Sequence, residues 1–127
     1  MSRLPSQLSE TAEKVNQFIE GVVNLEREPT VLYQAARHII DAGGKRLRPY
    51  LILKSCKLVG GREEDAVPTA AALELLHTFT LIHDDIIDED KKRRGIPTVH
   101  VKWGVPTAIV AGDLLFAKVY ETITKYT

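Results

Sequence analysis

Residues 70–88 read AAALELLHTFTLIHDDIID, and this stretch has the clearest pattern in the sequence. We expect it to lie in a long helix over about 66–88, with Asp65 as the N-cap and Pro68 in the first turn. The apolar side chains of this helix change from small to large along its length. The small ones are Ala70, Ala71 and Ala72, and the large ones that follow are Leu75, Leu76, Phe79 and Ile82.

The rest of the chain also has a helical pattern. No run of residues alternates between apolar and polar with hairpin turns on either side, so we expect an all-α fold in a single domain, residues 1–127. The pairs Gly43-Gly44 and Gly60-Gly61 end helices, because glycine adopts the left-handed conformation that often follows a helix. Residues 89–98 are expected to form a charged loop. The other predicted helices span about 6–25, 29–41, 50–59 and 106–127.

The composition excludes several classes of protein. The chain has 127 residues, of which 44% are hydrophobic and 27% charged, so it can bury a core. Its 17 basic and 17 acidic residues leave no net charge that would attract nucleic acid or a membrane surface. The single cysteine excludes an intrachain disulfide, and residues 1–16 lack the apolar segment of a secretory signal. The stretch 105–117 is too short and too interrupted to span a bilayer, so we expect a soluble cytoplasmic protein.

A pair of aspartates at the end of the 66–88 helix is the strongest candidate for a functional site. Asp84 and Asp88 are four residues apart and therefore lie on one side of the helix, with His77 two turns earlier on the same side. Two adjacent carboxylates repel each other unless a cation binds between them, and Mg²⁺ prefers such oxygen ligands. A solvated acidic helix end is the simpler alternative. Negative charge at a helix C-terminus opposes the helix dipole, which favours a bound cation or neighbouring bases.

Two basic segments suit the binding of phosphate groups. Residues 91–94 read KKRR, and arginine forks can grip diphosphate oxygens. Residues 43–49 read GGKRLRP, where two glycines free the backbone and three bases lie near a helix N-terminus. Either segment alone could be a solvated basic loop, and the second lacks the spacing of a P-loop. Together with the acids they predict two phosphorylated groups, one held through metal and the other mainly by cationic side chains.

The order and spacing of these motifs resemble those of the trans-isoprenyl diphosphate synthase family, and the pattern is closest to archaeal-type geranylgeranyl diphosphate synthases. The resemblance runs from about residue 32 to residue 116. It implies an all-α, isoprenoid-synthase-type helical bundle with a deep apolar cavity, of which this chain would supply the N-terminal helices. The matching motifs are GGKRLRP at 43–49, ELLH at 74–77, LIHDDIID at 81–88, RRGIPT at 93–98 and AGDLL at 111–115.

The resemblance also implies a reaction and the residues that carry it. The reaction is the 1′-4 condensation of isopentenyl diphosphate with an allylic diphosphate, by ionisation, condensation and elimination. The allylic diphosphate would bind through Mg²⁺ on Asp84 and Asp88 with help from Arg93, and these groups would stabilise the departing diphosphate. The residues that would hold isopentenyl diphosphate are Lys45, Arg48, His77 and Arg94.

Phe79 and Thr80 are the candidates for setting the product length. Phe79 precedes Asp84 by five residues, which is roughly 7.5 Å along a helix. Its ring could therefore form the floor of the cavity, beside the small Thr80. An aromatic residue at this place, with an uninterrupted DDxxD, resembles enzymes that make a C20 product. Simple core packing of Phe79 is the alternative.

The chain departs from the family in its length. Family members carry a second aspartate-rich motif that completes the metal site, and this sequence lacks it, so we expect little or no turnover by the chain alone. It would then be a fragment, a natural short form, or one part of an assembly with a complementary chain. The alternative function is a non-catalytic helical subunit or dimerisation module that keeps a diphosphate site. A phosphohydrolase with His83-Asp84 as an HD pair is a weaker rival, because it needs further histidine ligands.

The last predicted helix indicates a further partner. It has a broad apolar face, which either the earlier helices or another chain must cover. We therefore expect a homo-oligomer that forms through this helix. The apolar side chains are Leu114, Leu115, Phe116, Val119, Tyr120 and Ile123.

Overall fold

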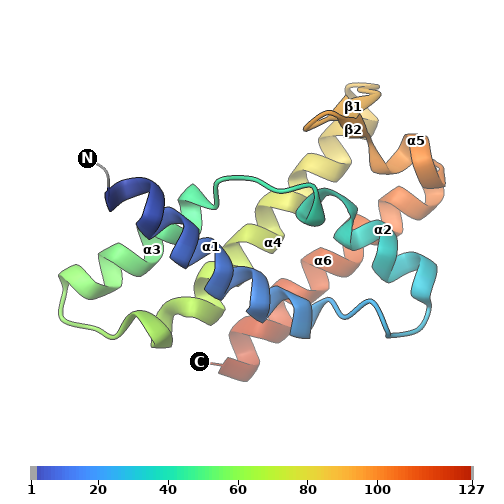
Figure 1. Cartoon of the computed structure of the whole chain (residues 1–127). Coiled ribbons are helices and arrows are strands. Elements are labelled where there is room, and N and C mark those ends of the chain that lie inside the picture. The colour runs from blue at the N-terminus through green and yellow to red at the C-terminus, as the bar shows by residue number, and fades with distance from the viewer. Residues whose placement is uncertain (1–2, 127) are drawn as a thin grey trace.

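The computed structural model describes residues 3–126, which form six helices and one short hairpin (Figure 1). The hairpin pairs β1 (Lys92–Arg93) with an antiparallel β2 (Ile96–Pro97). The predicted all-α fold class is confirmed. The helices are α1 (Arg3–Val22), α2 (Thr30–Asp41), α3 (Leu47–Leu58), α4 (Glu63–Ile87), α5 (Val99–Trp103) and α6 (Val105–Tyr126).

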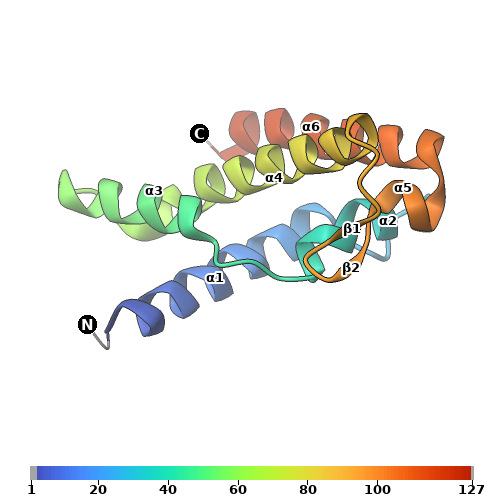
Figure 2. The same cartoon turned by 90° about the horizontal axis from the view of Figure 1, so that it is seen from above.

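Helices α4 and α6 are the centre of the fold. They lie side by side and make the most extensive contact between any two elements in residues 3–126. Figure 2 shows them in one layer, with α1 and α2 in a second layer and the hairpin crossing from the end of α4 toward α2. Small side chains on both central helices let their backbones approach closely. Fully buried side chains in this core include Ala70, Ala71, Leu75, Ala108, Ala111 and Leu115.

Helix α4 begins three residues before its predicted start, and Asp65 is not its N-cap. Arg62 occupies that position without a hydrogen bond from its side chain. Glu63, Glu64 and Asp65 together fill the first turn. Their negative charges face the positive end of the helix dipole, which stabilises the helix without a capping side chain. Pro68 consequently lies in the second turn.

The predicted charged loop at 89–98 contains the β1–β2 hairpin, and the short helix α5 follows it. The sequence pattern indicated neither element. The turn of the hairpin is formed by Arg94 and Gly95, with φ angles of 54° and 79°. Two consecutive left-handed residues make the turn that best fits the twist of a hairpin, and Asn-Gly or Asp-Gly usually supplies it. The pair Arg-Gly does not carry that signal, and each strand is only two residues long.

The apolar face of α6 is only partly covered. Leu115 and Val119 are buried against the other helices. Phe116 and Tyr120 remain 39% and 60% exposed.

Among the helices of residues 3–126, none combines the length and the apolar character needed to cross a bilayer.

Candidate active site

Asp84 and Asp88 lie at the C-terminal end of α4, where Asp88 is the C-cap. Both are exposed, and neither carboxylate has a hydrogen bond or ion pair with another residue in 3–126. No group of three His, Cys, Asp or Glu side chains in that range is arranged to hold a metal ion. Mg²⁺ typically takes one or two carboxylates and fills its other positions with water and phosphate oxygens. The two aspartates therefore fit Mg²⁺ that binds together with a phosphate ligand.

Asp85, between the two exposed aspartates, points inward and is 1% exposed. Its carboxylate accepts three hydrogen bonds from Arg93, at 3.1 and 2.9 Å from Nε and 2.8 Å from Nη2. These hydrogen bonds, with the negative charges of Asp85, Asp90 and Asp84, raise the pKa of Arg93 against the opposing effect of burial. The acidic end of α4 and the basic hairpin are thus joined by a charge-assisted fork.

Asp85 is not among the site residues predicted from the sequence, although the helical period contains the signal for its inward direction. Positions 75, 78, 82 and 85 recur at intervals of three and four residues, and each is no more than 1% exposed. Such a spacing marks the inner face of a helix. Asp85 continues the buried stripe that begins at Leu75, whereas Asp84 and Asp88 lie outside it.

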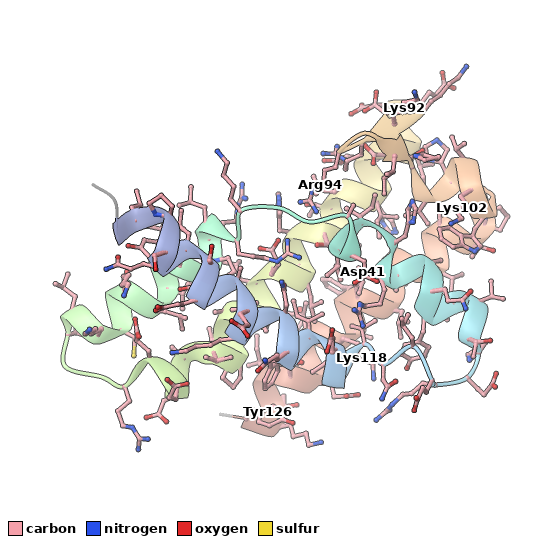
Figure 3. The ribbon with its side chains drawn as sticks, in the orientation of Figure 1. Asp41, Lys92, Arg94, Lys102, Lys118 and Tyr126 are labelled. Carbon is pink, nitrogen blue, oxygen red and sulfur yellow. The ribbon has the colours of Figure 1, made fainter. Side chains whose placement is uncertain are left out.

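Arg94 follows Arg93 in the hairpin but contacts a different helix. Its Nη1 donates hydrogen bonds to the carbonyl oxygens of Ile39, at 2.8 Å, and Gly43. Figure 3 shows Arg94 beside the loop that follows α2, while Lys92 of the same hairpin points away from the protein. The hairpin is therefore attached to α4 through Arg93 and to the C-terminal end of α2 through Arg94.

His77 on α4 contacts Arg48 at the start of α3. Nη1 of Arg48 lies 3.3 Å from Nε2 of His77. A guanidinium can only donate, so Nε2 accepts and the neutral ring carries its proton on Nδ1. Burial lowers the pKa of His77, and the positive charges of Arg48, Arg94 and Arg93 lower it further, while Glu74 has the opposite effect. His77 is consequently an uncharged group among cations at neutral pH.

The three bases of the GGKRLRP segment point in different directions. Lys45 and Arg48 are exposed, whereas Arg46 between them is buried. Lys45 has no hydrogen bond or ion pair within the described part of the chain, and it borders an open groove beside Leu4 and Leu8 of α1. The structure therefore brings two cations, Arg48 and Arg94, together around the uncharged ring of His77. We call Arg48, Arg94 and His77 the cationic group, and Lys45 has no contact with it among residues 3–126.

Arg93 connects the acid pair with the cationic group. The negative charge of Asp84 contributes to the raised pKa of Arg93. The positive charge of Arg93 contributes to the lowered pKa of both His77 and Arg94. The predicted acids and the predicted cations therefore share one region at the C-terminal end of α4.

Phe79 and Thr80 face different surroundings. The half-buried ring of Phe79 lies 4.7 Å from the ring of His83 and 5.0 Å from that of Phe116, between α4 and α6. Thr80 is exposed, and its hydroxyl donates a 2.6 Å hydrogen bond to the carbonyl oxygen of His77. The contacts of Phe79 are compatible with core packing and equally with the end wall of a cavity.

His83 contacts α6 and has no histidine partner. Its Nε2 donates a 3.0 Å hydrogen bond to the carbonyl oxygen of Ile109 and lies 3.8 Å from Asp113. The ring occupies the space above Gly112, where a Cβ atom would overlap it. No described His, Cys, Asp or Glu residues gather around it as a metal site. The structure therefore gives no support to the HD phosphohydrolase.

Comparisons with known proteins establish the family. The chain belongs to the polyprenyl synthetase family, whose model matches residues 29–127. Geranylgeranyl diphosphate synthase of Sulfolobus acidocaldarius is 47% identical over 125 residues, which are 98% of this chain and 37% of the relative. The crystal structure of geranylgeranyl pyrophosphate synthetase from Pyrococcus horikoshii Ot3 has a TM-score of 0.94 and 46% identity, over 97% of this chain and 37% of that one.

A more distant structure contains ligands. Polyprenyl synthase from Caulobacter crescentus CB15, in complex with calcium and isoprenyl diphosphate, has a TM-score of 0.82 and 32% identity, over 95% of this chain and 38% of that one. The predicted resemblance to isoprenyl diphosphate synthases, and to archaeal geranylgeranyl diphosphate synthases in particular, is confirmed. The chain spans a little over a third of the length of these relatives.

An NMR titration of the His77 ring tests the cationic environment. We expect its midpoint to lie below about 6.5, the value of an unperturbed histidine, because burial and nearby cations disfavour the protonated ring. The folded state resists protonation, so His77 lowers the stability of the protein progressively as the pH falls below the pKa of the unfolded chain. Arg48→Gln should raise the midpoint, and Lys102→Gln on α5 should not. A midpoint at or above that of an unperturbed histidine, unmoved by Arg48→Gln, would contradict this environment.

Proposed function

We propose that the protein containing this chain is a cytoplasmic prenyltransferase that condenses isopentenyl diphosphate with an allylic diphosphate. The contacts of the hairpin support the proposal, because Arg93 binds Asp85, which lies between Asp84 and Asp88 in the chain, and the adjacent Arg94 belongs to the group of cations around His77. Two diphosphates bound there would be neighbours, as a reaction between them requires. The names of the geranylgeranyl diphosphate synthase relatives agree with this activity. Residues 1–127 would form one domain, the N-terminal helices of an isoprenoid-synthase-type bundle.

The allylic diphosphate would bind at the end of α4. Asp84 and Asp88 would hold Mg²⁺, which when bound supplies positive charge to the diphosphate oxygens as a Lewis acid. Arg93 is held in place by Asp85, and its Nη1 has no hydrogen bond among the residues that the structure describes. That N–H group is therefore available to a diphosphate oxygen. The calcium and isoprenyl diphosphate in the Caulobacter crescentus structure agree with a divalent cation beside such a ligand.

Isopentenyl diphosphate would bind to the cationic group. Arg48 and Arg94 would neutralise its diphosphate, with Lys45 at the edge of the site. His77 would stay uncharged and fix the orientation of Arg48 through their contact. The two bound diphosphates would hold the allylic C1 close to the double bond of isopentenyl diphosphate, which converts an encounter in solution into a reaction between positioned groups.

The chemistry needs charge stabilisation and no protein nucleophile. The C1–O bond of the allylic diphosphate breaks, and the electron pair leaves with the diphosphate. The double bond of isopentenyl diphosphate attacks C1 to form the new C–C bond, which leaves a carbocation on the isopentenyl unit. C2 of that unit then loses a proton to the released diphosphate, and the electron pair of the broken C–H bond forms the double bond of the longer prenyl diphosphate. Arg93 is fixed before the reaction and would stabilise the negative charge that develops on the leaving diphosphate.

We propose a C20 product, with Phe79 as a residue that limits its length. The relatives named geranylgeranyl diphosphate synthases support this length. Phe79 is braced by Phe116 at 5.0 Å and by His83 at 4.7 Å, so its ring cannot easily swing aside for a longer chain. Thr80 is exposed and faces other surroundings than Phe79, and its influence on the product length stays a prediction.

Calorimetric binding of inorganic diphosphate tests the metal role. We expect binding to need Mg²⁺, and Asp84→Ala to weaken it by roughly tenfold or more, the typical loss for one charge-assisted contact. Asp65→Ala is the matched control, because it removes an exposed aspartate at the other end of the same helix. Equal affinity with and without Mg²⁺ would reject the metal role.

Incorporation of labelled isopentenyl diphosphate into allylic products, by protein expressed from the whole reading frame, separates the enzyme from a non-catalytic subunit.

We also propose that the protein self-associates through the exposed face of α6. The rings of Phe116 and Tyr120 meet edge to face with centroids 5.2 Å apart, and both remain accessible to a partner. Sedimentation at low micromolar concentration should show a dimer or larger species, and Tyr120→Glu should shift it toward monomer. Leu58→Glu is the control, because Leu58 is an exposed apolar residue on α3. A wild-type monomer at these concentrations would refute self-association.

A further inference from the structure

We propose that Arg46 and Glu74 are positioning residues that hold the Arg93–Arg94 hairpin in place without touching a substrate. Both side chains are buried, with 4% of Arg46 and 3% of Glu74 exposed. Because both are buried, neither offers an exposed group to a diphosphate at the surface of the site. Their effect would pass through the loop after α2, which is also the point where Arg94 attaches.

Arg46 joins three segments of the chain with one guanidinium. Its Nε donates a 2.9 Å hydrogen bond to Oδ1 of Asn16 on α1, and its Nη2 donates one of 2.9 Å to the carbonyl oxygen of Ile40 in α2. Its Nη1 donates to the carbonyl oxygen of Gly43 at 3.3 Å and to Oε1 of Glu74 on α4 at 3.4 Å. The backbone of Arg46 is left-handed, with φ at 55°. This backbone conformation directs the side chain of Arg46 into the core, whereas the neighbouring Lys45 and Leu47 are exposed.

Arg46 and Arg94 meet at the same loop. Both donate to the carbonyl oxygen of Gly43, just beyond α2. Each also donates to a carbonyl oxygen near the C-terminal end of α2, Arg46 to that of Ile40 and Arg94 to that of Ile39, so both cap the negative end of the α2 dipole. A Cβ atom on Gly44 would lie 2.8 Å from Nη1 of Arg46 and 3.2 Å from Nη2 of Arg94, so the two guanidinium groups converge on that glycine. Burial lowers the pKa of Arg94, repulsion by the positive charge of Arg46 lowers it further, and Glu74 opposes this effect.

The position of Arg94 therefore depends on Arg46. Arg46 holds the carbonyl oxygen of Gly43, which Arg94 also binds, and the carbonyl oxygen of Ile40, the neighbour of the Ile39 acceptor of Arg94. Glu74 offsets the repulsion between the two cations. Arg94 in turn fixes the turn of the hairpin, and the adjacent Arg93 lies beside the acid pair. The Arg46–Glu74 pair would thus set the spacing between the two proposed diphosphate sites.

Two variants separate this role from a general contribution to stability. Arg46→Met with Glu74→Leu removes both charges together, so the net charge is unchanged, and apolar replacement of a buried ion pair often preserves stability. Arg46→Lys keeps a cation beside Glu74 but loses the fork that reaches the α2 carbonyl oxygens. Arg37→Met is the matched control. It removes another buried arginine, which donates to the carbonyl oxygen of Val23 and not to the hairpin loop.

Hydrogen exchange tests the proposal without any ligand. We expect the backbone amides of the β1–β2 hairpin to exchange roughly tenfold faster in both Arg46 variants, as expected for the loss of one charge-assisted hydrogen bond. Exchange in the centre of α6 should not change. Arg37→Met should leave the hairpin protected. Unchanged hairpin exchange in the folded variants would overturn the proposal, and so would equal acceleration in the hairpin and in α6. If the double variant does not fold, the exchange rates of Arg46→Lys alone decide whether the proposal holds.

Binding of inorganic diphosphate with Mg²⁺ provides the second measurement, and this part rests on the proposed function. The Arg46 variants should bind roughly tenfold more weakly at a temperature at which they are folded, while Arg37→Met should lower the thermal midpoint and keep the affinity. Unchanged affinity in both Arg46 variants would overturn the link between the pair and the site. If the wild-type chain binds no diphosphate, the proposed function fails, and the exchange measurement still decides the positioning role.

Discussion

The ion pair between Asp85 and Arg93 is the interaction on which the arrangement of the site depends. A carboxylate buried in the last turn of a helix is doubly unfavourable, because it loses its hydration and faces the negative end of the helix dipole. Three hydrogen bonds from Arg93 compensate for both effects. This requirement keeps the basic hairpin against the acidic end of α4. Asp84 and Asp88 can then remain exposed beside a fixed cation.

A second balance of charge holds the other side of the site. Arg46 and Arg94 lie close together at the end of α2. Their repulsion is reduced by the buried carboxylate of Glu74 and by the carbonyl oxygens at the helix C-terminus. Arg48, at the start of α3, contacts His77 on α4. Burial lowers the pKa values of His77 and Arg94, and the positive charges of neighbouring arginines lower them further. An anion would reduce the repulsion among these arginines, whereas Asp84 and Asp88 favour a cation. The site thus combines a part that favours a cation, at Asp84 and Asp88, with a part that favours an anion, at Arg48 and Arg94.

Much of the fold follows from local signals in the sequence. Paired glycines end α2 and α3, and the helical period places Asp84 and Asp88 together because this relation lies within one helix. The same period cannot say which side of a helix becomes buried, so the inward direction of Asp85 was not anticipated. Three bases in GGKRLRP predicted one anion-binding cluster, yet the left-handed backbone of Arg46 turns one of them into the core.

The features that the sequence did not reveal arise from contacts between distant segments. The hairpin is stable because Arg93 and Arg94 bind α4 and α2, and a two-residue strand with an Arg-Gly turn carries no pattern of its own. Likewise, the early start of α4 depends on three acids acting together on the helix dipole. The local sequence pattern identifies the candidate ligands. Tertiary packing decides which of them are buried and hold other residues in place, and which remain exposed.

A double-mutant cycle on Asp85 and Arg93 tests the central interaction most directly. The unfolding free energies of the wild type, Asp85→Asn, Arg93→Gln and the double variant would be measured in urea. We predict a coupling energy of at least about 1 kcal/mol, because Arg93→Gln alone leaves a buried carboxylate without its partner. Additive losses that agree within about 0.5 kcal/mol would show that the two side chains do not stabilise each other, and would contradict this account of the site.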